Sequence, residues 1–281
     1  MSMELCVLAS GSSGNCSIVR TPGGAMLLDA GIGPRIVSRR LTGAGVQVSD
    51  VSAICLTHLD RDHFAPVWVN HIVRLGIIVH CHERCVDDLK KIAENRLLAA
   101  LIRPFGELRF TPMPGVAAIP IALAHDREGS HGFVLEGYGR RIGYATDLGY
   151  VPDPLVEHFS DLDVLALESN YDPHMQERSP RPIFLKRRIT GGSGHLSNQQ
   201  ALDAIRRMLD QAERRERPLP AHIVLLHRSR QCNCPRLVRE LFSTDPRIAP
   251  RLVLTEAFSR SEWLSAAGRP VAVGEQLLLA W

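Results

Sequence analysis

The segment HLDRDH, residues 58 to 63, places two imidazoles and two carboxylates within six positions of the chain. They belong to His58, Asp60, Asp62 and His63, which follow the apolar run VSAICLT. Crowding carboxylates beside imidazoles is unfavourable unless a cation neutralises them, so the segment indicates a metal site. The alternative is a solvated acidic turn, because Asp and His also cap helices and a helical pattern begins near Phe64.

Three more residues of ligand type follow apolar runs that predict buried strands. His125 comes after IPIALA, Asp147 after RIGYAT, and His227 after HIVLL. Strand ends converge at one edge of a sheet, so we expect these residues to meet the HLDRDH segment. Two groups of about three side chains with one shared carboxylate would suit two metal ions and leave a position for water.

The elements that must position these residues are read from hydrophobic periodicity and turn residues. Strands are predicted at residues 3–9, 16–20, 25–29, 51–57, 108–112, 116–124, 132–136, 140–145, 163–169 and 222–227. Helices are predicted from about Pro34, and at residues 64–75, 83–102 and 197–215. We expect two mixed β-sheets flanked by helices, in a single domain spanning residues 1–281 with no inserted second domain.

Composition limits the class of protein further. The 281 residues are 45% apolar and 22% charged, which is ordinary for a globular chain with a full core. The net charge of +3 is too small to indicate nucleic acid or acidic lipid by itself. The sequence lacks a long apolar run and a basic leader, and its seven cysteines are too sparse for a disulfide scaffold. We expect a cytoplasmic protein with no membrane partner.

Taken in chain order, HLDRDH, His125, Asp147 within YATDLG, and His227 resemble the metallo-β-lactamase superfamily, whose usual motif is HxHxDH. Asp29 in LLDAG is similar to the early structural aspartate of that superfamily. The resemblance implies an α/β, four-layer αββα sandwich. The motifs LASGSSGN (8–15), HD (125–126), ESNYD (168–172) and GHLSN (194–198) resemble the YycJ (WalJ) subfamily, which lacks an inserted domain and whose members are regarded as 5′-to-3′ DNA exonucleases.

The resemblance implies two divalent metal ions and assigns their ligands. His58, Asp60 and His125 would hold the first ion, Asp62, His63 and His227 the second, and Asp147 would bridge them. Asp60 departs from the family, because it stands where the usual motif has its second histidine. The carboxylate would make the first site harder and favour Mn²⁺, with zinc still suitable and iron not excluded. Alternatively Asp60 does not reach the metal, and the first ion is weak or absent.

Two adjacent divalent ions can generate hydroxide from a bridging water and clamp a phosphodiester during in-line attack. Asp62 would orient that nucleophile. A likeness to tRNase Z implies that His195 protonates the leaving group and that Glu168 orients and charges His195. The alternatives are structural: Glu168 caps a turn, and His195 begins a helix whose N-cap is Ser197 or Asn198.

Candidate substrate contacts lie in two regions. Ser12, Ser13 and Asn15 form a Gly-rich turn that either offers N–H groups to phosphate or is only a tight hairpin. Ser197 in the GHLSN loop and Arg228, directly after His227, are further candidates. Positive charge at KRR (186–188), Arg228 and Arg230 would form a phosphate track.

DNA is therefore the expected substrate. Two other functions stay open at this point: a metallohydrolase acting on a small cyclic phosphodiester, lactone or thioester, and a noncatalytic nucleic-acid or protein adaptor that has lost one metal through the change at Asp60.

Overall fold

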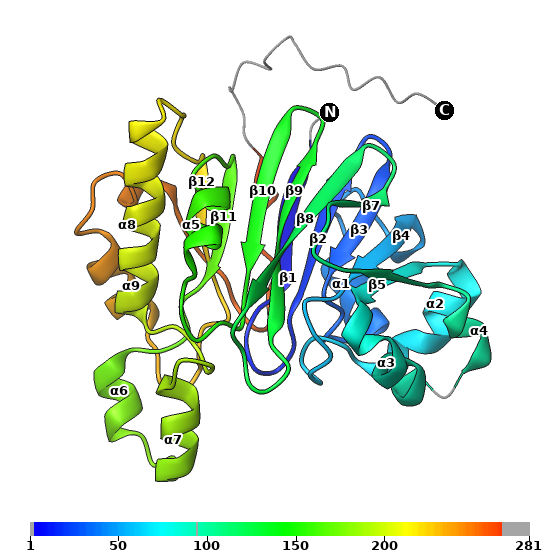
Figure 1. Cartoon of the computed structure of the whole chain (residues 1–281), viewed down its shortest axis with the longest axis horizontal. Coiled ribbons are helices and arrows are strands. Elements are labelled where there is room, and N and C mark those ends of the chain that lie inside the picture. The colour runs from blue at the N-terminus through cyan, green and yellow to red at the C-terminus, as the bar shows by residue number, and fades with distance from the viewer. Residues whose placement is uncertain (1–2, 94, 266–281) are drawn as a thin grey trace.

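Two mixed β-sheets stack face to face at the centre of the molecule, and helices cover both outer faces (Figure 1). The computed structural model describes residues 3–93 and 95–265. The layers run helix, sheet, sheet, helix, so the predicted αββα sandwich is confirmed.

Each sheet combines antiparallel and parallel strands. The first has the order β1-β2-β3-β4-β5-β6 and is antiparallel up to β3 and parallel from there on. The second has the order β13-β12-β11-β10-β9-β8-β7 and is parallel from β13 to β10 and antiparallel from there on. The strands are β1 (Glu4–Ala9), β2 (Cys16–Thr21), β3 (Gly24–Leu28), β4 (Val51–Cys55), β5 (Ile78–His82), β6 (Ile102–Phe105), β7 (Phe110–Met113), β8 (Val116–Leu123), β9 (Ser130–Gly137), β10 (Arg140–Ala145), β11 (Val164–Glu168), β12 (His222–Leu226) and β13 (Leu252–Leu254).

The helices form the two outer layers and one separate pair. Beside the first sheet lie α1 (Pro34–Arg40), α2 (Val69–Leu75), α3 (Val86–Ala93) and α4 (Arg96–Ala99), and beside the second lie α5 (Asp153–Phe159), α8 (Asn198–Arg214) and α9 (Pro235–Phe242). Helices α6 (Pro173–Arg178) and α7 (Ile183–Thr190) lie apart, below the second sheet in Figure 1. Short 3₁₀ turns are η1 (Val48–Asp50), η2 (Pro66–Trp68), η3 (Glu83–Cys85) and η4 (Ala249–Arg251).

Apolar side chains fill all three spaces between the four layers. Trp68 belongs to the cluster between the first sheet and its helices, Phe133 to the cluster between the sheets, and Leu209 to the cluster under α8. All three side chains are essentially inaccessible to water. Close packing on both faces of both sheets gives the strand ends fixed positions.

The candidate ligands follow strand ends, as the sequence predicted. His58 lies just past β4, His125 just past β8, Asp147 just past β10, and His227 directly after β12. Asp147 and His227 have φ angles of 55° and 52°, in the left-handed region that L-residues rarely adopt. Such conformations are unfavourable and cluster at functional sites, where the surrounding structure holds them in place.

One predicted element is wrong. The helix expected over residues 83–102 is divided into η3, α3 and α4, and its last residue begins strand β6, which pairs with β5. The carboxamide of Asn95 accepts a hydrogen bond from the N–H of Leu97 (2.9 Å) and starts α4 as a separate helix. Local capping therefore interrupts an amphipathic pattern that is continuous in the sequence.

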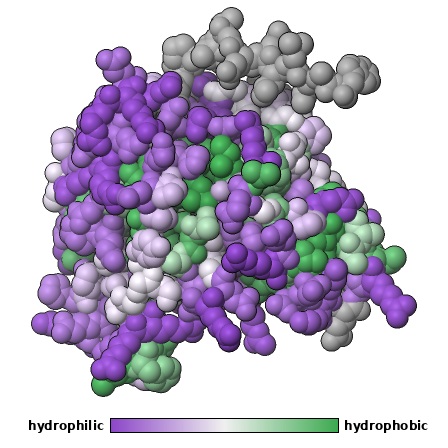
Figure 2. All heavy atoms as spheres, viewed as in Figure 1, coloured by the Kyte–Doolittle hydropathy of each residue, from purple (hydrophilic) through white to green (hydrophobic). Residues whose placement is uncertain are grey.

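The face shown in Figure 2 is mostly hydrophilic, with apolar atoms gathered at its lower tip over α7. Ile183 and Phe184 are the exposed apolar residues of that helix. Within the described parts of the chain, no helix combines the length and the apolar character that crossing a bilayer requires.

An ion-pair network near the C-terminal end of the described chain gives a prediction about stability. The Asp245 carboxylate is nearly buried and lies 2.9 Å from Arg247 and 3.3 Å from Arg206. The hydrogen bond from Arg247 lowers the pKa of Asp245 from 3.8 to about 2. A lowered pKa stabilises the fold above about pH 4, and this contribution is lost as the pH falls through 2. We expect Asp245→Asn to lower the free energy of unfolding at pH 7 by about 1 kcal/mol, given partial solvent screening.

Urea unfolding of both proteins between pH 7 and pH 3 measures this difference. The gap between wild type and variant should narrow toward the acid end, whereas a constant gap would contradict the electrostatic origin.

Candidate metal centre

Two groups of three side chains meet at the strand ends. His58, Asp60 and His125 form one group, and Asp62, His63 and His227 form the other. Within each group every residue offers a ligand atom, and these atoms lie within 4.8 Å of one another. The groups coincide with the two ligand sets that the resemblance implied.

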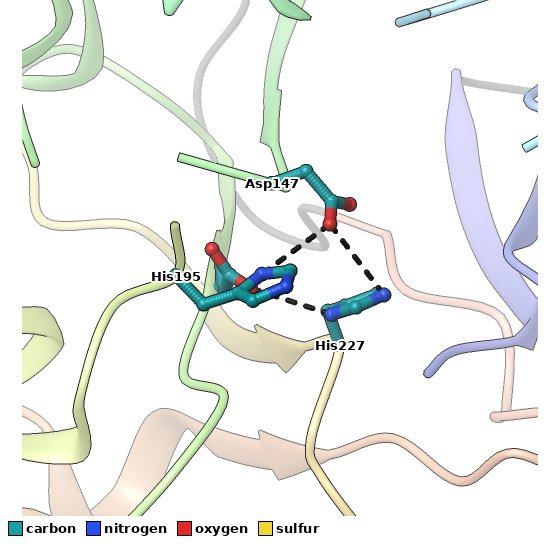
Figure 3. A group of neighbouring side chains, drawn as sticks. Asp147, His195 and His227 are labelled. Atoms are coloured by element: carbon teal, nitrogen blue, oxygen red, sulfur yellow. Dashed lines mark hydrogen bonds and ion pairs between the residues drawn. The ribbon is translucent and has the colours of Figure 1, made fainter. Parts of the chain in front are cut away.

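Asp147 lies between the two groups. Its Oδ2 is 2.9 Å from His63 Nε2, and its Oδ1 is 3.6 Å from His227 Nε2 and 3.8 Å from His125 Nε2. Figure 3 shows the carboxylate of Asp147 pointing toward His227 and His195. One buried carboxylate thus faces members of both groups, which is the geometry that a bridging ligand needs.

Hydrogen bonding and donor chemistry fit divalent cations. The Nε2 atom of His58 is buried and has no hydrogen-bond partner among the described residues, although it belongs to the first group. A buried polar atom without a partner is unfavourable, and a metal ion would satisfy it. Burial and the neighbouring His63 lower the pKa of His58, which keeps its imidazole neutral, the form that binds metal.

The charges of the second group also favour the binding of cations. Burial would raise the pKa of Asp62, but the hydrogen bond from His227 and the nearby His63 lower it to about 2. Burial opposes a charge on His227, yet Asp147 and Asp62 raise its pKa to about 10. The imidazoles therefore hold protons only to balance the carboxylates, and divalent ions would replace these protons.

Asp60, the departure from the usual motif, does reach the first group. Its Oδ2 lies 3.8 Å from His58 Nε2, and its side chain is 54% exposed. Partial burial of the side chain raises the pKa of the Asp60 carboxyl. This placement is compatible with Asp60 as a ligand of the first ion.

Buried second partners orient the histidines. His63 Nδ1 donates to Asp29 (2.8 Å), and the Thr57 hydroxyl also donates to Asp29 (3.0 Å) and lies 2.9 Å from His58 Nδ1. Asp29 has a φ angle of 60°, so it too is held in a strained conformation. Asp29 was identified from its resemblance to the family, whereas Thr57 was missed, because a threonine at a strand end carries no distinctive signal.

Asn15 contacts the loop that carries Asp62 and His63, and it does not line the pocket into which this site opens. Its backbone N–H donates to the carbonyl of Asp62 (2.6 Å), and its side-chain amide lies 2.9 Å from His63 Nε2. Its side-chain oxygen accepts from the N–H of Gly11 (2.8 Å). Because Asn15 is almost completely buried, its contacts favour a role in positioning Asp62 and His63 over the substrate contact expected from sequence.

Glu168 and His195 form the expected pair. His195 Nδ1 donates to Glu168 Oε1 at 2.7 Å and lies 3.4 Å from Asp147 Oδ1. Glu168 is fully buried, and its other oxygen accepts from the N–H of Leu148 (3.0 Å). Burial opposes both charges, but their mutual attraction raises the pKa of His195 and lowers that of Glu168. The His195 and His227 rings are stacked with centroids 5.1 Å apart. Figure 3 shows the two side chains next to each other and beside Asp147.

Asn170 is a member of the site that sequence reasoning missed. Its amide donates to the carbonyl of His227 (2.7 Å) and lies 2.9 Å from His227 Nδ1. The hydroxyl of Ser10 accepts from the His227 N–H (2.7 Å). The ESNYD motif contained the signal for Asn170, but only its glutamate was assigned.

The metal centre opens into a pocket of about 360 Å³. Ser12 lines it, and Ser13 is exposed on the same loop. Two arginines on its far wall are already paired: Arg188 with Asp126, and Arg181 with Gln231 (3.2 Å). Arg188 belongs to the predicted KRR segment, whereas Arg181 was not predicted.

Two predicted substrate contacts lie elsewhere. Ser197 is the N-cap of α8, where its hydroxyl accepts from the N–H of Gln200 (3.2 Å), so the structural alternative describes its contacts. Arg228 does not line this pocket, because its guanidinium turns to Glu256 (2.7 Å) and to the carbonyl of Thr255 (3.2 Å).

Comparison with known proteins agrees with this geometry. The sequence matches the family described as the beta-lactamase superfamily domain over residues 25–223. It is 25% identical over 246 residues to the exodeoxyribonuclease YycJ of Bacillus anthracis, an alignment that covers 85% of this chain and 87% of that protein.

Solved structures share the fold at low sequence identity. The metallo-β-lactamase fold protein YhfI from Bacillus subtilis has a TM-score of 0.65 and 12% identity, and the match covers 92% of this chain and 99% of that chain. The short form of human tRNase Z has a TM-score of 0.61 and 17% identity, with coverage of 92% and 99%. By its family match over most of its length, the chain belongs to the metallo-β-lactamase superfamily, and it is a metal-dependent hydrolase similar to YycJ.

Proposed function

We propose that the chain is a DNA exonuclease that degrades strands from the 5′ end. The observation that carries the proposal is the pair Glu168–His195: the buried Glu168 binds His195, which lines the pocket beside residues of both ligand groups. A phosphodiester leaves behind a sugar alkoxide that must collect a proton, and this pair is suited to supply one. The relative named exodeoxyribonuclease supports DNA as the substrate.

The residues on hand suit two divalent ions. His58, Asp60 and His125 would hold one ion, Asp62, His63 and His227 the other, with Asp147 shared. When bound, such ions acidify a water molecule and neutralise nonbridging phosphate oxygens. The extra carboxylate of Asp60 favours Mn²⁺, while Zn²⁺ and iron also suit a mixed set of nitrogen and oxygen ligands.

Asp62, His195 and Glu168 have separate roles in orienting water and transferring protons. Asp62 is ionised, partly exposed and lines the pocket, so it can orient an attacking water molecule by accepting a hydrogen bond. His195 uses Nδ1 to bind Glu168, which leaves Nε2 to donate a proton to the departing sugar oxygen. Glu168 stays buried and ionised and thereby keeps His195 charged.

The size of the pocket supports action at strand ends. A volume of about 360 Å³ lies near the lower end of the range for small-molecule pockets and suits a single terminal nucleotide. The same volume also favours the second candidate function, hydrolysis of a small phosphodiester. Leu185 and Ile189 give this pocket an apolar wall, and Arg181 and Arg188 already have partners.

The first prediction concerns substrate and polarity. Purified protein supplied with Mn²⁺ should release mononucleotides from the 5′ end of oligonucleotides labelled at either terminus. A 5′ end blocked by a bulky group should be resistant, because the pocket admits one terminal nucleotide. If single- and double-stranded DNA both stay intact while bis-p-nitrophenyl phosphate is hydrolysed, the small-molecule alternative holds.

The second prediction concerns the shared carboxylate. Asp147→Asn should lower DNA hydrolysis about a hundredfold or more, because it removes the charge that both groups face. Elemental analysis of the Asp147→Asn variant should show fewer than two divalent ions per chain. Asp153→Asn is the matched control, since Asp153 is an exposed acid that pairs with Arg207 on the surface, and this variant should leave activity and metal content unchanged. Equal metal content in wild type and Asp147→Asn would contradict the bridging role.

The third prediction separates proton donation from metal binding. His195→Ala and Glu168→Gln should each lower kcat on DNA about a hundredfold or more, because the sugar oxygen then leaves unprotonated. Turnover of bis-p-nitrophenyl phosphate should change little, because nitrophenolate leaves without a proton. Equal losses on both substrates would assign the pair a structural role.

A further inference from the structure

A second pocket shares a wall with the metal centre. Along the segment after β12, His227, Ser229 and Gln231 line the first pocket, while Arg228 and Arg230 line a second one of about 190 Å³. The loop after β1 is divided in the same way, with Ser12 in the first pocket and Ser10 in the second. We call the second the Phe258 pocket; it is lined by Ser10, Arg228, Arg230, Thr255, Glu256 and Phe258 among others. Adjacent residues are about 3.8 Å apart, so the two pockets are neighbours.

An exposed aromatic ring stands at the Phe258 pocket. The side chain of Phe258 is 63% exposed, although burying such a ring is worth about 2 kcal/mol. The guanidinium carbon of Arg230 lies 4.7 Å from the ring centroid, in the range of a cation–π contact. A ring held by an arginine and open to solvent is a surface on which a nucleic-acid base can stack.

The charged groups of this pocket differ from those of the metal centre. The first pocket is lined by four aspartates, Asp60, Asp62, Asp126 and Asp147, and by two arginines, Arg181 and Arg188, whereas the Phe258 pocket has two arginines and one acid, Glu256. Its lining therefore carries one excess positive charge, which favours an anion.

Arg228 gives an independent reason to expect an anion. Its side chain is only 10% exposed, and its Nη2 binds Glu256, but its Nε has no hydrogen-bond partner among the described residues. A buried, unpaired N–H of a charged group is unfavourable. A phosphate oxygen entering this pocket is the kind of acceptor that the protein itself does not supply.

We propose that the Phe258 pocket binds the nucleotide adjoining the one held at the metal centre, with its base on Phe258 and its phosphate at Arg230 and Arg228. This inference rests on the proposed action on DNA. Stacking is tolerant of base identity, so the subsite would hold the strand in place without selecting a sequence. It would explain why Arg228, directly after the ligand His227, turns away from the metal centre.

The test measures affinity against strand length. In the presence of EDTA, wild-type protein should bind a 5′-phosphorylated trinucleotide at least tenfold more tightly than the mononucleotide. Phe258→Ala and Arg230→Gln should abolish most of this gain, while Phe258→Tyr should retain it because the ring remains. With Mn²⁺, both disruptive variants should raise KM for oligonucleotides about tenfold at nearly unchanged kcat, and turnover of bis-p-nitrophenyl phosphate should stay the same.

Controls separate this subsite from general effects and from the proposed function. Leu108→Ala removes another exposed apolar side chain, 82% exposed and outside both pockets, and should match wild type in every assay. The subsite is overturned if wild type shows no gain with length, if Phe258→Ala keeps the gain, or if inorganic phosphate alone competes as well as the trinucleotide does. Two further outcomes separate the subsite from the proposed function. If DNA is bound with a Phe258-dependent gain but never hydrolysed, the exonuclease proposal fails and the subsite stands. If wild type and Phe258→Ala hydrolyse DNA identically, the subsite fails and the exonuclease proposal stands.

Discussion

The site depends on a concentration of negative charge, which the described chain balances only by holding protons on its histidines. Asp147 and Glu168 are buried, Asp62 is partly buried, and no lysine or arginine of residues 3–93 and 95–265 forms an ion pair with any of them. Within the described chain their charge partners are histidines. The same carboxylates raise the pKa values of His227 and His195. Burying carboxylates in this way is tolerable only with cations nearby, and two divalent ions satisfy the carboxylates and free the imidazoles to act as ligands.

The fold bears a local conformational cost to achieve this concentration. Asp29, Asp147 and His227 all adopt left-handed backbone angles, which cost about 1 kcal/mol or more each. Hydrogen bonds offset the strain where it occurs: Ser130 donates to the carbonyl of Asp147 (2.6 Å), and Ser10 accepts from the N–H of His227 (2.7 Å). The strained residues turn their side chains toward the common centre, and the close packing of the strands that precede them holds their backbone in place.

Sequence reasoning succeeded where a residue's type and its place in a strand pattern coincide. Histidines and aspartates directly after apolar runs could be assigned to one edge, because the ends of buried strands converge there. It could not place side chains whose contacts depend on their direction: Asn15 supports the ligand loop, and Arg228 turns to Glu256 and lines the Phe258 pocket instead of the pocket at the metal centre. The division of residues 83–102 was missed for a related reason, because hydrophobic periodicity does not register a cap such as Asn95.

The segment after β12 connects the chemistry to substrate binding. His227 is held by Asn170 and Ser10, and the residues that follow it line the two pockets alternately. The hydrogen bonds that fix His227, a candidate ligand, therefore also fix the wall between the pockets. A strand lying across this wall would meet carboxylates and imidazoles on one side and arginines with an aromatic ring on the other. The backbone of residues 227–231 would then fix the position of the strand-binding subsite relative to the cleavage site. No motion of the sheets would be required.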